Sequence, residues 1–227
     1  MKVACLWSGG KDSVYACHLA LSMGFEVKRL VTFFPQDPES ELLHVPNIRW
    51  TTLQAESIRL PQDIISVPKN YEREVLHQTL LQLKSKLGLE GVVAGIIASR
   101  YQKRVLQEVC DEIGLQLITP IWSRDQFEVL HSIIREGFKA IIVGVYAEGL
   151  TQQWLGREVD ETFLSHLKRL SRIWGINPSG EGGEYETFVV DAPRFTKRVK
   201  VLDHKIVWYR NWGELIILNA TLIEKES

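Results

Sequence analysis

The segment KVACLWSGGKDSVYACHLALSMG, residues 2–24, decides the fold of this chain. Its first part, from Lys2 to Trp7, is an apolar run typical of a buried strand. After SGGKDS, apolar residues recur at helical spacing from Val14 to Gly24. The segment therefore predicts a strand, a glycine loop and a helix, which together form the first unit of an α/β fold.

The alternation of strands and helices continues to about residue 120. Apolar or helix-periodic segments predict strands at 27–33, 64–67, 91–97 and 115–119, and helices at about 50–60, 71–87 and 101–113. Apolar strands that alternate with helices are typical of a parallel, doubly wound sheet. We therefore expect a first domain at residues 1–120 that is built around such a sheet.

The pattern changes after Pro120. It predicts a helix near 125–136, a strand at 140–146, a helix near 160–174, and β segments at 187–191, 198–210 and 214–224. The last three resemble an antiparallel meander or hairpin. Residues 121–227 are therefore expected to form a smaller α+β domain.

Composition limits the classes of function. The 227 residues include 27 Lys and Arg against 28 Asp and Glu, so no global field draws the protein to nucleic acid or to an anionic membrane. The first residues are too short an apolar run for a signal peptide or a membrane span, which favours a cytoplasmic protein. Cys5, Cys17 and Cys110 lie far apart in the sequence, so we expect buried apolar side chains rather than disulfides or a zinc site.

The glycine loop has the composition of an anion site. It consists of Ser8, Gly9, Gly10, Lys11, Asp12 and Ser13. The glycines allow a tight turn with exposed amides, the serines add hydroxyl donors, the lysine adds charge, and the helix N-terminus is partly positive. These groups suit a phosphate or pyrophosphate. The alternative is a tight turn in which Asp12 only caps the helix.

The spacing of the loop differs from the Walker loop and from the dinucleotide GxGxxG pattern. It resembles the PP-loop of the HUP-like adenine-nucleotide α-hydrolases, which cleave ATP between its α and β phosphates. This resemblance implies that the loop binds the departing pyrophosphate and that Asp12 helps to bind Mg²⁺. Gly95, at the end of GVVAG, would let a nucleotide approach the carboxyl edge of the sheet, or would serve packing alone.

A second cluster lies in GEGGEYETF, residues 180–188, with carboxylates at Glu181, Glu184 and Glu186. Strand alternation would place Glu184 and Glu186 on one face. Two close carboxylates raise each other's pKa, so the pair suits a cationic group, a metal or ammonia. The alternative is a solvated acidic hairpin.

Three further features accompany this cluster: ASRYQ at 98–102, WLGREVDE at 154–161, and the pair His44 and Asn47. Together with GEGGEYETFVVDAP they resemble the diphthine–ammonia ligases in their short, single-polypeptide, archaeal-like form. These enzymes complete diphthamide on elongation factor 2. The resemblance extends from Lys2 to about Phe195, and EGGEYET is its most specific part.

The resemblance implies an ATP-dependent, AMP-forming carboxylate–ammonia ligase. The diphthine carboxylate would attack the α phosphate of ATP, and ammonia would then displace AMP. ATP and Mg²⁺ are the expected cofactors, and elongation factor 2 and ammonia the expected partners; a homo-oligomer is compatible with the sequence. The catalytic residues would be Lys11, Asp12, Glu184 and Glu186, with Ser8 to Ser13 and Gly95 at the nucleotide.

Diphthine carries a trimethylammonium group, which aromatic faces and carboxylates bind. The substrate-binding candidates are His44, Asn47, Tyr101, Gln102, Trp154, Arg157, Glu181, Gly183, Glu184, Tyr185 and Glu186. For each aromatic residue in this set the alternative role is packing in the core, and for each acidic residue it is exposure to solvent. Arg157 would bind a phosphate or carboxylate, or else pair with Glu158 or Asp160.

Two other functions compete with the ligase. A tRNA-modifying enzyme would use the same loop to adenylate a base, but thiolation calls for a cysteine pair and RNA binding for a basic surface, and the sequence has neither. A non-catalytic nucleotide sensor would need the loop without a substrate domain.

Overall fold

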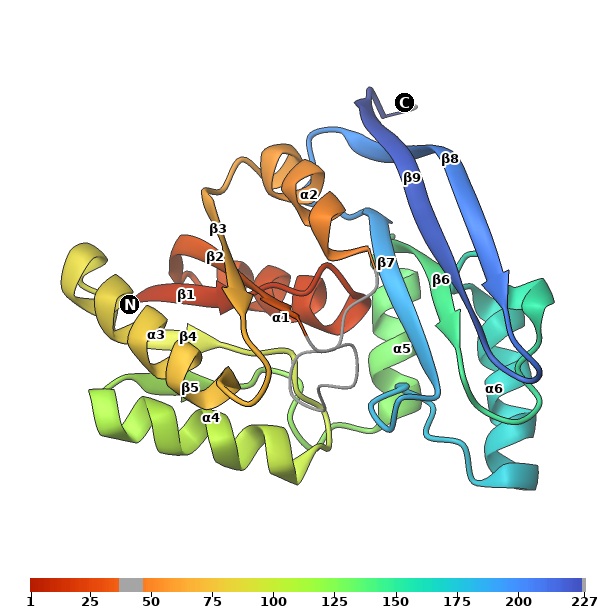
Figure 1. Ribbon diagram of the computed structural model, residues 1–227, viewed down its shortest axis with the longest axis horizontal. Coiled ribbons are helices and arrows are strands. Elements are labelled where there is room, and N and C mark those ends of the chain that lie inside the picture. Colours follow the sequence, from red (N-terminus) through yellow and green to blue (C-terminus); the bar gives the residue numbers. More distant parts are fainter. Residues whose placement is uncertain (37–46, 226–227) are drawn as a thin grey trace.

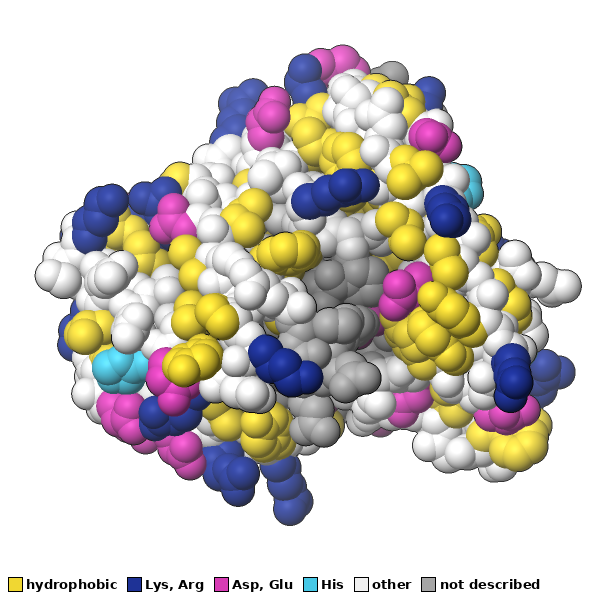
Figure 2. All heavy atoms as spheres, viewed as in Figure 1, with side chains coloured by type: hydrophobic (Ala, Val, Ile, Leu, Met, Phe, Trp, Pro, Cys, Tyr) yellow, Lys and Arg dark blue, Asp and Glu magenta, His cyan; other side chains and the backbone are white. Residues whose placement is uncertain are grey.

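The computed structural model describes residues 1–36 and 47–225 of the chain. His44 lies outside the described residues. The strands gather into two sheets that lie side by side, the first on the left and the second on the right of Figure 1. Lys and Arg side chains are mixed with Asp and Glu over the face shown in Figure 2, in keeping with the balanced composition.

The first sheet is parallel and has the order β3-β2-β1-β4-β5. Its strands are β1 (Lys2–Leu6), β2 (Glu26–Pro35), β3 (Gln62–Val67), β4 (Gly91–Val93) and β5 (Gln116–Ile118). The helices between them are α1 (Lys11–Ser22), α2 (Thr51–Ile58), α3 (Glu72–Leu87) and α4 (Arg100–Ile113). The expected doubly wound α/β fold is confirmed. The strand order reverses between β1 and β4, and ligands of such sheets bind at the carboxyl edge at that point.

Buried side chains form two hydrophobic clusters, one on each face of the first sheet. Leu76 and Leu80 of α3 and Val109 of α4 pack against one face. The other face packs against α1, in a cluster that also contains Phe188 and Val189 of the second sheet. The two sheets therefore share one core. All three cysteines are buried and free, as the sequence predicts.

The second sheet is antiparallel and has the order β7-β6-β9-β8. Its strands are β6 (Lys139–Val145), β7 (Tyr185–Asp191), β8 (Arg198–Trp208) and β9 (Gly213–Ile223), accompanied by α5 (Gln126–Arg135), α6 (Glu161–Trp174) and the short 3₁₀ turn η2 (Gln152–Trp154). β8 and β9 form the expected hairpin. The alternative, a meander of β7, β8 and β9, is excluded, because β6 lies between β7 and β9 and pairs with both. The pairing of β6 with β7 and β9 joins segments that lie far apart in the chain. The pattern of apolar residues within each strand therefore does not reveal it.

A segment of the first half reaches across to the second sheet. It comprises the 3₁₀ turn η1 (Ile48–Trp50), the residue before it, Asn47, and α2. Asn47 donates from Nδ2 to the carbonyl of Leu215 at 2.8 Å and accepts from the amide of Ile217 at 2.7 Å. The Trp50 indole also donates to the Ile217 carbonyl. This segment therefore covers the backbone edge of β9 and holds the two sheets together.

Among the described residues, no helix has both the length and the apolar character needed to cross a membrane.

Candidate functional site

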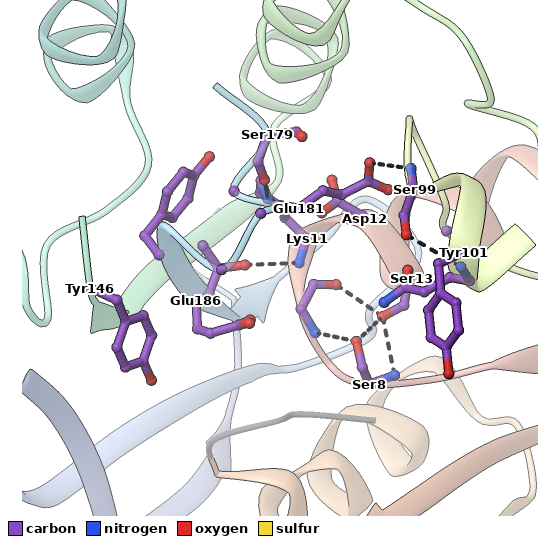
Figure 3. Close-up of a pocket in the computed structure, with 18 residues that line it drawn as sticks. Ser8, Lys11, Asp12, Ser13, Ser99, Tyr101, Tyr146, Ser179, Glu181 and Glu186 are labelled. Carbon is purple, nitrogen blue, oxygen red and sulfur yellow. Dashed lines mark hydrogen bonds and ion pairs between the residues drawn. The ribbon is translucent and has the colours of Figure 1, made fainter. Parts of the chain in front are cut away.

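A cavity of about 720 Å³ opens where the carboxyl edge of the first sheet meets β7 and the glycine-rich loop before it (Figure 3). Many of the predicted site residues line it together: Ser8, Gly10, Lys11, Asp12, Ser13, Gly95, Tyr101, Gln102, Glu181, Gly183, Tyr185 and Glu186. Gly9 belongs to the same loop. The folded chain therefore brings the two sequence clusters, which lie some 170 positions apart in the chain, into one site.

The glycine loop of residues Ser8 to Ser13, called the phosphate loop from here on, connects the end of β1 to the start of α1. The Ser8 hydroxyl donates to Ser13 Oγ at 2.9 Å, and the Ser13 hydroxyl lies 3.0 Å from the carbonyl of Gly10. Gly9 has a φ of +81°, which favours glycine. The side-chain bonds close the loop on itself, and the N-terminus of α1, with its partial positive charge, meets the cavity.

The loop is also fastened to β7 of the second sheet. The Lys11 amide donates to Thr187 Oγ1 at 3.1 Å, and the Val189 amide donates to the Gly9 carbonyl at 2.9 Å. Two strand residues thus hold two loop residues directly. The position of the loop therefore depends on both halves of the chain.

The Lys11 side chain is only 3% exposed and binds groups of the protein. Its ammonium donates to Asp12 Oδ2 at 2.9 Å and to the Ser179 carbonyl at 2.5 Å, and lies 4.9 Å from the centre of the Tyr185 ring. Burial by itself would lower the pKa of Lys11, but Asp12, Tyr185 and Glu186 together outweigh it and raise the pKa, so the side chain is charged. Lys11 therefore places a fixed positive charge behind the loop and ties it to the glycine-rich segment.

Asp12 has one carboxylate oxygen in use and one free. Oδ2 accepts from Lys11, whereas Oδ1 is buried and has no partner among the described residues. Burial raises the pKa of Asp12, and the neighbouring Lys11 opposes that shift. A free buried carboxylate oxygen beside a phosphate loop fits Mg²⁺, which binds proteins through one or two carboxylates together with substrate phosphates. Within the described ranges, no group of three or more His, Cys, Asp or Glu forms a separate metal site.

Glu181 anchors the glycine-rich loop to the first sheet. Its carboxylate accepts hydrogen bonds from three successive amides, those of Ile97, Ala98 and Ser99, at 2.5, 2.5 and 3.0 Å. These amides lie between β4 and α4, where successive backbone N–H groups form a concave anion site. Burial raises the pKa of Glu181 and the amides oppose it. The arrangement closes the cavity on the side of α4.

Glu186 lies toward the other end of the cavity, near Tyr146 (Figure 3). The pKa of Glu186 is raised to about 8, chiefly by burial; Lys11 opposes the shift, while Asp12 and Glu214 add to it. The Tyr146 hydroxyl donates to Glu214 Oε1 at 2.8 Å. This end of the site therefore combines an aromatic ring with two carboxyl groups, one of which titrates near neutral pH.

Glu184 does not share the face of Glu186, so this prediction was wrong. β7 begins at Tyr185, and Glu184 still belongs to the turn before it, where strand alternation does not apply. Glu184 Oε1 accepts from the Asn177 amide at 3.0 Å, and its other oxygen is buried without a partner among the described residues. The residue does not line the cavity.

Three further candidates also lie outside the cavity. Trp154 is 8% exposed and packs against Phe163 and His166, with ring centres 4.9 and 4.8 Å away. Arg157 lies over the Trp154 ring at 4.7 Å. Neither predicted partner of Arg157 pairs with it: Glu158 binds Lys139, and Asp160 caps α6. Asn47, as described above, binds the backbone of β9.

Several cavity residues were not predicted: Ser99, Tyr146, Ser179, Gly180, Gly182 and Thr187. Most of them lie within or beside the quoted strings, so a wider reading of those strings would have included them. Tyr146 is different, because it follows β6 and reaches the site only through the pairing of β6 with β7. No local signal marks it.

Comparisons with known proteins identify a family for both halves of the chain. The diphthamide synthase N-terminal domain family matches residues 1–117, and the diphthamide synthase C-terminal domain family matches residues 125–223. A diphthine–ammonia ligase of Rattus norvegicus is 32% identical over 88% of this chain and 83% of its own length. The human protein of that name is 31% identical over 91% of this chain and 85% of its own length.

The relatives differ in length. A diphthine–ammonia ligase of Schizosaccharomyces pombe is 30% identical over the whole of this chain, which spans 40% of that protein. A solved structure described as a predicted subunit of a tRNA methyltransferase from Methanocaldococcus jannaschii covers 85% of this chain and 98% of its own, with 17% identity and a TM-score of 0.46. This similarity is too low to define the fold, which rests instead on the strand orders given above.

Proposed function

The chain belongs to the diphthamide synthase family, and from this premise we propose that it is an ATP-dependent ligase that converts diphthine on elongation factor 2 into diphthamide. Ammonia is the nitrogen donor, and AMP and pyrophosphate are the other products. The observation that carries the proposal is the single cavity in which the phosphate loop faces carboxyl groups from the second half of the chain. A simple nucleotide sensor would need the loop alone.

In the first step, an oxygen of the diphthine carboxylate attacks the α phosphorus of ATP. The bond from that phosphorus to the bridging oxygen breaks, and pyrophosphate leaves with the electron pair, which gives an acyl adenylate. The phosphate loop and the N-terminus of α1 would stabilise the charge that gathers on the pyrophosphate. The fixed charge of Lys11 adds to this stabilisation at short range.

Asp12 would bind Mg²⁺ together with the phosphates, through its free Oδ1. Such an ion supplies positive charge to the phosphate oxygens. The residue's other oxygen is held by Lys11 at 2.9 Å, so the carboxylate keeps a fixed direction toward the cavity. Ser8 and Ser13 would contribute hydroxyl groups at the same phosphates.

In the second step, the nitrogen of ammonia attacks the carbonyl carbon of the acyl adenylate, and AMP leaves with the electron pair of the broken C–O bond. The nitrogen must lose a proton as the amide forms. Glu186 is suited to accept it, because its pKa of about 8 lies near working pH. The ring of Tyr146 and the carboxyl of Glu214 would face the cationic part of diphthine.

The division of the chain near residue 120 into a nucleotide-binding and a substrate-binding domain belongs to the same proposal. So does a cytoplasmic location, because the substrate is a translation elongation factor.

The test incubates the protein with ATP, Mg²⁺, an ammonium salt labelled with heavy nitrogen, and diphthine-bearing elongation factor 2. We expect AMP and pyrophosphate in equal amounts and heavy nitrogen in the modified histidine. Heavy oxygen placed in the diphthine carboxylate should appear in AMP, because the acyl adenylate hands that oxygen to the phosphate. AMP release without nitrogen incorporation would contradict the ligase and favour a tRNA substrate, whereas an absence of AMP would favour a sensor.

A further inference from the structure

The buried side chain of Gln54 in α2 joins three separate segments around the phosphate loop. Its Oε1 accepts from the indole of Trp7 at 3.0 Å, and its Nε2 donates to the carbonyl of Gly9 at 3.0 Å and to that of Val189 at 2.7 Å. The residue has no exposed surface. Because an indole only donates and a carbonyl only accepts, these partners also fix which end of the amide is oxygen.

The bond from Gln54 fixes the Gly9 carbonyl, which lies next to the free amides at the start of α1. Gly9 precedes the N-cap residue Gly10, so its carbonyl lies outside α1, and the first amides of α1, including that of Ser13, have no acceptor within the helix. The Gly9 carbonyl, which lies beside these amides in the chain, accepts from Gln54 Nε2 and from the Val189 amide at 2.9 Å. Within residues 1–36 and 47–225, no acceptor is found for the Ser13 amide, which is left at the N-terminus of α1 for an anion.

The direction of the Gly9 carbonyl matters because its oxygen carries partial negative charge. If it faced the cavity it would repel a phosphate. Because it faces Gln54, the amides of Asp12 and Ser13 at the start of α1 can face the anion without an opposing carbonyl. Gly9 has a φ of +81°, and no side chain restrains its peptide, so partners outside the loop must hold it. Gln54 and Val189 are those partners.

We propose that Gln54 is a positioning residue for pyrophosphate, which holds the Gly9 carbonyl out of the anion site and fixes that site to β7. The inference rests on the proposed function, because it assumes that the loop binds the phosphates of ATP. Val189 follows Glu186 and Thr187 on β7, and both of these line the cavity. One buried amide therefore sets the loop and the carboxyl-bearing strand in a fixed relation to each other.

Ser57 provides a matched control on the same helix. It is 1% exposed, its hydroxyl donates to the Lys197 carbonyl, and it accepts from the Lys197 amide at 3.1 Å. Like Gln54, it joins α2 to the second half of the chain. Its hydrogen-bond partners lie near the start of β8, away from the phosphate loop. Ser57→Ala therefore removes a comparable buried link and leaves the loop unchanged.

The experiment measures the affinity for inorganic pyrophosphate with Mg²⁺ by calorimetry, and the Tm, in wild type, Gln54→Met and Ser57→Ala. Methionine keeps the volume and removes the donors. We expect Gln54→Met to weaken pyrophosphate binding by about tenfold, the effect of one or two lost hydrogen bonds, and to raise KM for ATP. Ser57→Ala should lower the Tm and keep wild-type affinity.

Gln54→Glu gives a second, independent readout if the methionine variant does not fold. A charged carboxylate would face two carbonyl oxygens, whereas its protonated form donates one hydrogen bond again. Relative to wild type at each pH, the pyrophosphate affinity of Gln54→Glu should therefore recover as the pH falls.

Two results would overturn the inference: wild-type affinity in both Gln54 variants, or an equal loss of affinity in Ser57→Ala at a matched fall in Tm. A wild-type protein that does not bind pyrophosphate would overturn the proposed function itself, and with it this inference.

Discussion

Gly95 lies against the backbone of Asp12 so closely that a Cβ on Gly95 would be 2.5 Å from the carbonyl carbon and oxygen of Asp12. This glycine, two residues after the end of β4, is thus required by contact with the phosphate loop. Of the two roles open from the sequence, packing is the one that this distance establishes. The packing is against the loop itself, so it fixes the position of the residues that we propose bind the nucleotide.

Gly95→Ala should therefore displace the loop. We expect a loss of about 1–3 kcal/mol in the free energy of unfolding, because backbone atoms must move, and at least a tenfold weaker affinity for ATP. Gly88→Ala is the control. Gly88 has a φ of +63° with open space around it, so the substitution there costs backbone strain alone. Chemical denaturation and calorimetry measure both quantities; wild-type ATP affinity in Gly95→Ala would contradict this prediction.

Asp12→Asn should abolish the dependence of pyrophosphate binding on Mg²⁺. The substitution keeps the shape of the side chain and removes the negative charge that would bind the ion through Oδ1. We expect AMP release to fall by about a hundredfold or more, the usual effect of removing a charged group at a developing charge. Pyrophosphate affinity, measured with Mg²⁺ and with a chelator, should differ in wild type and coincide in the variant. A remaining Mg²⁺ effect would place the ion elsewhere.

Glu186→Gln and Glu184→Gln form a matched pair, two positions apart, with only Glu186 lining the cavity. We expect Glu186→Gln to keep ATP affinity and to lose amide formation by about a hundredfold, because the proton acceptor is gone. Glu184→Gln should keep both. Single-turnover assays with diphthine-bearing elongation factor 2 separate adenylation from amide formation, and equal losses in the two variants would assign no special role to Glu186.

The raised pKa of Glu186 also predicts how stability changes with pH. The folded carboxyl titrates at about 8 against an ordinary value of 4.5, so the folded state binds more protons between these values. The free energy of unfolding should therefore fall as the pH rises from 4.5 through 8, and Glu186→Gln should remove that slope. Tm profiles of the two proteins that run parallel over this range would show that the pKa is not raised.

Asn47→Ala should weaken the connection between the two sheets. The variant loses two hydrogen bonds to the backbone of Leu215 and Ile217, which we expect to cost about 1–3 kcal/mol of unfolding free energy. ATP affinity should stay within twofold, because the bonds lie outside the cavity. Urea denaturation and calorimetry provide the check. A large loss of ATP affinity at unchanged stability would show that Asn47 contributes to binding, as the sequence predicts.

Much of the fold could be predicted because the sequence is locally consistent. The apolar run before SGGKDS, the helical spacing after it, and the repeated alternation up to β5 specify a parallel sheet without any knowledge of tertiary contacts. The order of the second sheet could not be predicted in the same way. β6 pairs with β7, some 40 positions later, and also with β9, and such pairing depends on packing across the whole chain.

The site shows the same division. Ser8 to Ser13 and Glu181 to Glu186 are contiguous strings with a recognisable chemistry, and the fold brings most of them together. The prediction for Glu184 failed because β7 begins only at Tyr185, so Glu184 lies in the turn before the strand, where strand alternation does not apply. Gln54 and Tyr146 carry no motif. They act through long-range contacts that only the folded chain reveals.

The hydrogen bonds between the phosphate loop and β7 limit how the two halves of the chain can be exchanged between related proteins. The two family-matched halves of the chain look like interchangeable modules, yet Thr187 and Val189 of one half hold Lys11 and Gly9 of the other. A chimera that joined the first half of this protein to the second half of a distant relative would therefore alter the geometry of its own phosphate loop, however well each half folded. Recombination between relatives should be tolerated only where these loop and strand residues are transferred together.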